Sequence, residues 1–242
     1  MQSKADYYAG DLASVIWIEQ SAELALQRRL TQSAKPDSSA TRFGKDRSVT
    51  ERKMQLLKQS RLDDLEELQD RLAGHPVMAW LQAVDGIGPQ LSALLIGLLE
   101  DAGGLLQFRH RSSLYRWCGL GVDAEGRAER PRKGMGEPLR FDRRLKAVLM
   151  GRIATQWIMA GRGLYHDLYR ERRPFYAQRF EVDASKPSRH VDSAARRVAV
   201  KLFLSHLWEQ ARIMEGLPVE PPYPHAILGH TSAPIPAAEA IA

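Results

Sequence analysis

Apolar residues recur along most of the chain at intervals of three and four, and this spacing predicts an all-α protein. The first periodic stretch covers residues 11–30. A second stretch opens with Ser48-Val49-Thr50-Glu51, the pattern of a capping box, and stops at Gly74 and Pro76, which end helices. We therefore predict a helical hairpin or short coiled coil over residues 1–75. The apolar side of its second helix consists of Met54, Leu57, Leu62, Leu65, Leu68 and Leu72.

Two apolar stretches flank residues 84–89, Val-Asp-Gly-Ile-Gly-Pro, and predict two helices joined by a tight turn. Gly86 and Gly88 can adopt backbone angles that are closed to other residues. Gly88 can be the N-cap, with Pro89 at the first helical position, where its missing N–H costs no hydrogen bond. Such a turn exposes backbone N–H groups at the positive end of a helix, which is suited to a phosphate. The predicted phosphate-binding residues of this helix-hairpin-helix motif are Gly86, Ile87, Gly88, Pro89 and Gln90.

The helical pattern continues beyond this motif. A loop and a short helix over residues 107–120 are expected to turn Leu114, Trp117 and Cys118 toward the core. Longer helices are predicted at residues 139–159, 164–180 and 189–214.

The elements group into a helical domain over residues 76–216 that follows the N-terminal hairpin. After it comes a proline-rich tail, residues 217–242. We expect the tail to dock in an extended form and to be disordered after Thr231.

Composition places the chain among folded globular proteins, with 44% hydrophobic and 26% charged residues in 242. Cys118 is the single cysteine, so an internal disulfide is impossible and a reducing cytoplasm is expected. The sequence contains no signal-peptide pattern and no run of apolar residues long enough for a membrane span. We therefore expect a cytoplasmic protein with no membrane partner.

Positive charge is concentrated downstream of the glycine turn. Residues 109–152 hold 12 Lys and Arg against 5 acids, and residues 162–201 hold 10 against 5, whereas residues 1–80 are balanced at 12 and 12. This clustering favours a polyanionic partner over a merely solvated surface. The basic residues expected to follow a nucleic-acid backbone are Arg109, Arg111, Arg116, Arg130, Arg132, Lys133, Arg140, Arg143, Arg144, Arg196 and Arg197.

Several features have a second interpretation. Cations at the start of the 139–159 helix are unfavourable, and either phosphate or the neighbouring Asp142 could compensate them. The aromatic and arginine residues of 164–180 could stack on bases, but an aromatic core side is favoured.

The acidic cluster on the second helix is interpreted as a solvated face, and no His or Cys spacing indicates a metal site. We expect no metal and no cofactor.

An ordered set of segments resembles the C-terminal domain of the IS110/IS116/IS902 transposase family. The segments are the glycine turn, residues 108–120 ending in Cys118-Gly119-Leu120, the basic glycine-rich loop after them, the helix of residues 139–158, and residues 193–202 leading to Trp208. Together they cover roughly residues 76–215.

The resemblance implies DNA transposition, carried out in such enzymes by an RNase H-like nuclease domain together with a nucleophilic serine. The chain begins near the position of the family's coiled coil, so we expect it to lack the nuclease domain. The loop where the serine is expected, residues 121–136, contains no serine. We therefore expect no catalytic residue in this chain.

These observations predict a DNA-binding protein of a mobile element, with RNA as a possible ligand. One alternative is a transposase subunit whose activity is completed by a nuclease partner. Another is a helical interaction module. The N-terminal helices are the predicted surface for a nuclease partner or a homodimer.

Overall fold

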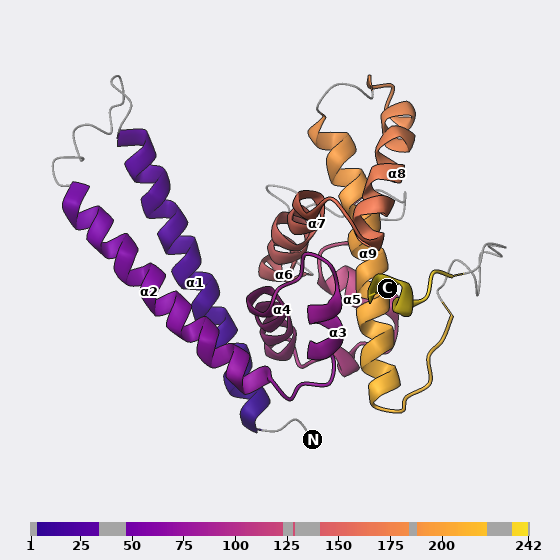
Figure 1. Cartoon of the computed structure of the whole chain (residues 1–242), viewed down its shortest axis with the longest axis horizontal. Coiled ribbons are helices and arrows are strands. Elements are labelled where there is room, and N and C mark those ends of the chain that lie inside the picture. Colours follow the sequence, from indigo (N-terminus) through magenta and orange to yellow (C-terminus); the bar gives the residue numbers. More distant parts are fainter. Residues whose placement is uncertain are drawn as a thin grey trace, which may run out of the picture. The chain divides into compact units, whose positions relative to one another are not determined.

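The computed structural model describes residues 4–33, 47–122, 128, 141–183, 188–221 and 234–241, and within them the fold is all-α. Figure 1 shows the helices. Their bounds are α1 Lys4–Ser33, α2 Arg47–Leu72, α3 Met78–Ala83, α4 Pro89–Asp101, α5 Arg111–Trp117, α6 Arg143–Ala147, α7 Ala154–Ala160, α8 Leu164–Arg179 and α9 Arg189–Met214, with short 3-10 turns at Leu105–Gln107 and Ala237–Ile241. The chain divides into unit 1, residues 1–73 and 96–103, and unit 2, residues 74–95 and 104–242.

Unit 1 is built on an antiparallel pair of helices, α1 and α2, which lie side by side in Figure 1. The Ser60 hydroxyl of α2 donates to Glu19 of α1 at 2.5 Å, and Arg61 pairs with Glu23 at 2.9 Å. Leu65, Leu68 and Leu72 of the predicted stripe are buried inside the unit. A helical hairpin is therefore formed within one chain, and these three leucines are not a free docking surface.

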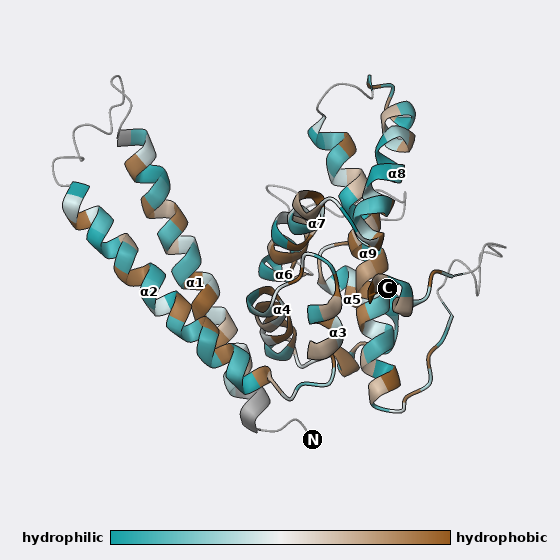
Figure 2. Cartoon of the chain, in the orientation of Figure 1, coloured by the Kyte–Doolittle hydropathy of each residue, from teal (hydrophilic) through white to brown (hydrophobic). Residues whose placement is uncertain are grey.

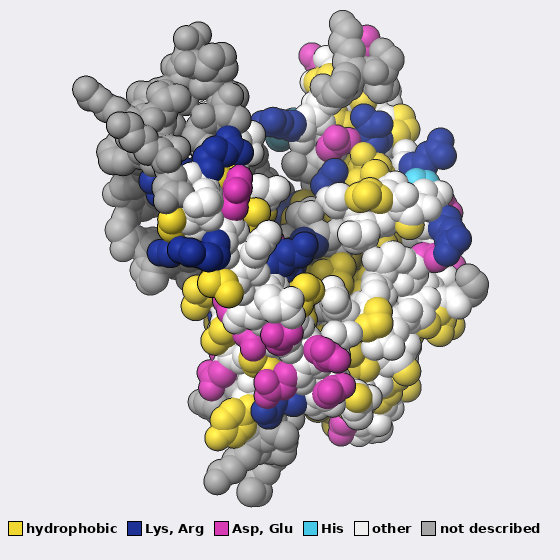
Figure 3. Space-filling model, turned by 60° about the vertical axis from the view of Figure 1, so that its left-hand side comes forward, with side chains coloured by type: hydrophobic (Ala, Val, Ile, Leu, Met, Phe, Trp, Pro, Cys, Tyr) yellow, Lys and Arg dark blue, Asp and Glu magenta, His cyan; other side chains and the backbone are white. Residues whose placement is uncertain are grey.

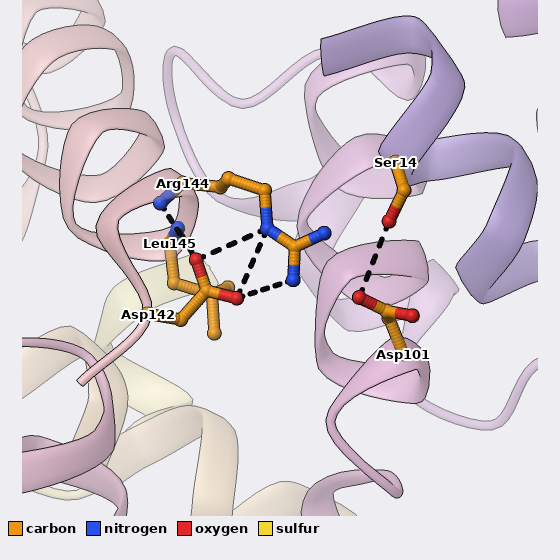
Figure 4. Close-up of polar contacts among 5 residues, drawn as sticks. All are labelled: Ser14, Asp101, Asp142, Arg144 and Leu145. Atoms are coloured by element: carbon orange, nitrogen blue, oxygen red, sulfur yellow. Dashed lines mark hydrogen bonds and ion pairs between the residues drawn. The ribbon is translucent and has the colours of Figure 1, made fainter. Parts of the chain in front are cut away.

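Residues 96–103 pack against this pair through small side chains. A methyl group at Gly97 would lie 2.7 Å from Cβ of Ala13 and 3.3 Å from a Leu68 methyl. The Ser14 hydroxyl donates to the Asp101 carboxylate at 3.2 Å (Figure 4). The small residues of α1 therefore let the end of α4 approach closely.

Unit 2 has an aromatic core centred on Phe203 of α9. The Phe203 ring lies 5.3 Å from Trp157 of α7, 5.5 Å from Tyr165 of α8 and 6.1 Å from Trp80 of α3, measured between centroids. In Figure 2 the hydrophobic residues of α9 lie mainly along its middle part. One long helix thus organises the core, and its bounds agree with the predicted range 189–214.

The predicted helix of residues 139–159 begins later and is not regular. α6 continues through a π-helical segment, Val148–Ile153, into α7. The buried residues Leu145 and Leu149 precede the irregularity, and Ile153 and Trp157 follow it. The π turn absorbs one residue, so that apolar side chains on both sides of it face the core.

Three expectations about local structure were wrong. α2 begins at Arg47, so Ser48 lies inside the helix rather than at its N-cap. Trp117 is 38% exposed, whereas Leu114 and Cys118 are buried as expected. Residues 234–241, expected to be disordered, are ordered on unit 2.

Two hydrogen bonds fasten residues 234–241. The Trp80 indole donates to the carbonyl of Ala237 at 3.4 Å. His206 Nε2 donates to the carbonyl of Ile235 at 2.9 Å, which leaves Nδ1 to accept from the Tyr165 hydroxyl at 2.8 Å. Burial lowers the pKa of His206 and favours this neutral form.

Candidate nucleic-acid interface

A five-residue turn joins α3 to α4, and α4 begins at Pro89 as the sequence predicts. The turn is closed by the Ile87 N–H, which donates to the Val84 carbonyl at 3.0 Å. The Ile87 side chain is only 2% exposed, so it anchors the turn from below and cannot itself contact a ligand. Gly88, Pro89 and Gln90 are exposed.

The two glycines of the turn have different roles. Gly86 has φ +76°, and a methyl group there would lie 3.2 Å from the backbone of Gln156 in α7. Gly86 therefore stabilises the fold, because another residue would be strained and crowded there. A methyl group at Gly88 would meet no atom of the described residues within 4 Å. Within that part of the chain, the space over Gly88 is open.

Backbone donors at this open position are unused. The Gly88 carbonyl accepts from the N–H groups of Leu91 and Ser92, at 3.1 and 3.0 Å, which starts the helix. The N–H groups of Gly88 and Gln90 donate to no acceptor in the described part of the chain. Free N–H groups at the positive end of a helix attract an anion.

Arg162 belongs to the same surface, although no sequence signal had singled it out. Its Nε donates to Asp85 of the turn at 2.9 Å, and its side chain is 77% exposed. A methyl group at Gly163, which has φ +87°, would lie only 3.0 Å from the Asp85 side chain, so glycine allows the close approach here. The glycines on either side of Arg162 are the signal that could have indicated a tight turn here.

The predicted arginines are not equivalent. Arg109, Arg116 and Arg143 are exposed. Arg111 is buried: it donates to the Glu220 carbonyl and pairs with Glu209 at 3.2 Å. Its guanidinium also lies 4.4 Å from the centroid of the Trp208 ring. Arg111 therefore holds the fold together and does not belong to the exposed surface.

Asp142 resolves the problem of cations at the start of α6. Its carboxylate caps the helix, accepting from the N–H groups of Arg144 and Leu145 at 2.6 and 3.2 Å (Figure 4). It also pairs with the Arg144 guanidinium at 2.5 Å. The carboxylate compensates the positive charge, as the second interpretation of this segment supposed.

The arginines of α9 reach two different neighbours. Arg196 donates to the Thr155 hydroxyl of α7 at 3.1 Å, and Arg197 donates to the Gly121 carbonyl at 2.5 Å. Thr155 precedes Gln156, on which the glycine turn rests. Arg196 and the turn thus share α7 as a support, while Arg197 lies near the end of α5. On the face drawn in Figure 3 the basic side chains are dispersed among uncharged ones.

Part of the predicted basic surface lies outside the described residues. Arg130, Arg132, Lys133 and Arg140 all fall in this part, as does most of the loop without a serine.

Other chemistry has little support among the described residues. Cys118 is buried, and burial together with the nearby Asp142 raises the pKa of its thiol. A buried, protonated thiol is a poor nucleophile.

In the described ranges no group of three or more His, Cys, Asp or Glu is arranged to hold a metal ion. No helix among these residues is both long and apolar enough to cross a bilayer.

Comparison of the chain with known protein families, with curated proteins and with solved structures gave no match. The resemblance to transposases therefore rests on the sequence segments alone and stays a prediction.

Proposed function

We propose that the protein binds DNA through the sugar–phosphate backbone, as part of the recombination of a mobile element. RNA is a second possible ligand of the same chemistry. The glycine turn binds one phosphate, and exposed arginines of unit 2 extend the contact. We also propose that the protein acts in the cytoplasm, which is consistent with its single cysteine.

One observation carries it: the exposed N-terminus of α4, where the N–H groups of Gly88 and Gln90 have no acceptor, and Gly88 has no cover, among the described residues. Arg162 supports it, because only its Nε is occupied by Asp85 and its side chain is exposed. A phosphate bound between these groups would be recognised without regard to sequence.

The test is a salt-titrated binding measurement on duplex DNA with the Gly88→Asp variant. The structure leaves room for this side chain, and an aspartate at an N-cap stabilises a helix. The variant should therefore fold while placing a carboxylate where the phosphate would lie. We expect the affinity for DNA to fall roughly tenfold or more. The introduced carboxylate repels the phosphate that the positive N-terminus of α4 would attract, and the counterion release that accompanies this phosphate contact is lost.

Gly88→Asn is the matched control, because it has the same shape without the charge and should bind nearly as well as the wild type. Affinity of the wild type should fall steeply with salt. Equal binding by Gly88→Asp and Gly88→Asn, or a salt-independent affinity, would contradict the proposal.

A further inference from the structure

A ladder of aromatic rings lies at the end of the α8–α9 pair where α8 finishes and α9 begins, at the top of Figure 1. Phe175 contacts Tyr176 with centroids 5.2 Å apart, and Tyr176 stacks on Phe180 at 5.6 Å. Phe180 then meets the His190 ring of α9 at 4.3 Å. We call these four residues the aromatic ladder.

The ladder is outside the core. Tyr165 and Tyr169, in the first half of α8, are buried, in agreement with the favoured interpretation of this segment. In the second half, Phe175 is 47% exposed, His190 is exposed, and Tyr176 and Phe180 are half-buried. The same helix therefore uses its aromatic residues in two ways, for packing near its start and on the surface near its end.

Arginines flank the ladder residues along the chain. Arg170, Arg179 and Arg189 are exposed and make no ion pair within the described residues, and the Arg172 guanidinium lies 5.8 Å from the centroid of the Phe175 ring. Of the nearby acids, Asp192 is occupied by Tyr169 and Arg173, each at 2.9 Å.

Glu171 lies 3.5 Å from Arg172, and Glu181 and Asp183 are exposed. The three arginines without a carboxylate partner therefore outnumber the two remaining exposed acids, Glu181 and Asp183, near the exposed rings.

We propose that the aromatic ladder is a binding site for single-stranded nucleic acid, with bases stacked on its rings and phosphates paired with the flanking arginines. The inference rests on the proposed nucleic-acid function and adds a strand state to it. Bases are available for stacking only when they are unpaired, and every base has a face that can stack, so the site is insensitive to sequence. The glycine turn, by contrast, contacts only a backbone.

The test measures binding of a labelled oligothymidylate and of a duplex of equal length to the full chain. Phe175→Leu keeps an apolar side chain of similar bulk at an exposed position and removes the ring. We expect it to bind the single strand roughly fivefold more weakly, or worse, and the duplex like the wild type. An oligonucleotide containing 2-aminopurine should lose its stacking-dependent quenching in the same variant.

The matched control lies outside the ladder. Ile213→Ala removes an exposed apolar side chain at the other end of α9 and should have no effect. Melting temperatures verify that all variants fold.

The inference is overturned if Phe175→Leu binds the single strand normally, if it weakens single strand and duplex equally, or if the wild type does not bind the oligothymidylate. Gly88→Asp in the same assay separates the two proposals. Gly88→Asp should weaken binding to the duplex, which tests the glycine turn. Phe175→Leu should weaken binding to the single strand only, which tests the ladder.

Discussion

Gly86 and Gly88 are two residues apart in one turn, yet only the first is favoured by its backbone conformation. Gly86 combines φ +76° with a close approach to the backbone of α7, and Gly88 has neither constraint. A pattern of two glycines around an isoleucine does not distinguish these roles. The distinction matters for any experiment on the turn, because an aspartate at position 86 would disturb the fold and an aspartate at 88 would not.

We predict that Gly86→Ala lowers the free energy of unfolding by roughly 1–2 kcal/mol, the cost of a left-handed conformation for a residue with a Cβ. Gly88→Ala should change it by less than about 0.5 kcal/mol, as is usual at an unconstrained surface position. Urea unfolding of both variants measures the difference. Similar losses at the two positions would show that the turn is not held as the structure has it.

Single residues were the least predictable part of the site. The arginines of 109–144 all look alike in sequence, and only the fold reveals that Arg111 is enclosed by Glu209, Trp208 and the chain at Glu220. Arg162 was missed because it is isolated, and its place beside Asp85 depends on a contact between distant parts of the chain.

At the scale of elements, helical periodicity was a good guide. The bounds of α9 and the start of α4 agree with the prediction, because long apolar stripes and a Gly-Pro start are strong local signals. The positions at which α2 and α6 begin were less well predicted. Polar residues that precede a helix resemble its first turn, and only packing decides which of them are included.

The α1–α2 pair contains a destabilising contact. Burial raises the pKa of Asp64, and the nearby Glu19 carboxylate raises it further. The folded state therefore holds the proton of Asp64 more tightly than the unfolded chain does, for which the ordinary value is 3.8. The free energy of unfolding accordingly falls as the pH rises from below 3.8 through the raised pKa, and it stays low at neutral pH.

We predict that Asp64→Asn raises the melting temperature at pH 7 and flattens its dependence on pH above about 4. The control is Asp70→Asn on the same helix, where the side chain is exposed. Thermal unfolding followed by circular dichroism across this range measures both. A lower melting temperature for Asp64→Asn at pH 7 would show that the Asp64 charge stabilises the pair.

At the scale of the whole molecule, charge is distributed unevenly along the chain. The segment that forms α1 and α2 is balanced, whereas the segments from α5 to α9 carry the excess of arginine and lysine. Composition alone predicts this division, although it does not reveal which of the basic side chains are exposed. If the excess serves a polyanion, equal changes of charge in the two regions should have unequal effects.

We predict that Arg143→Glu weakens binding to duplex DNA and lowers the slope of log affinity against log salt by about one. Lys58→Glu makes the same change of net charge on an exposed position of α2 and should leave the affinity within about twofold, because unit 1 carries no part of the proposed DNA-binding surface. Binding titrations at several salt concentrations compare the variants. Equal effects would indicate a response to net charge rather than to a surface.

The π turn between α6 and α7 makes this helix tolerant of a change in length. The buried residues 145, 149, 153 and 157 recur every four residues, and the wider π turn offsets the drift of about 40° per step that a regular helix would give them. Deleting one residue from 150–152 should close a normal α-helical turn and leave Trp157 against Tyr165. The same deletion in the middle of α9 would rotate every later side chain by about 100°. Deletion of a single residue during evolution is therefore expected to be accepted at the first place and rejected at the second.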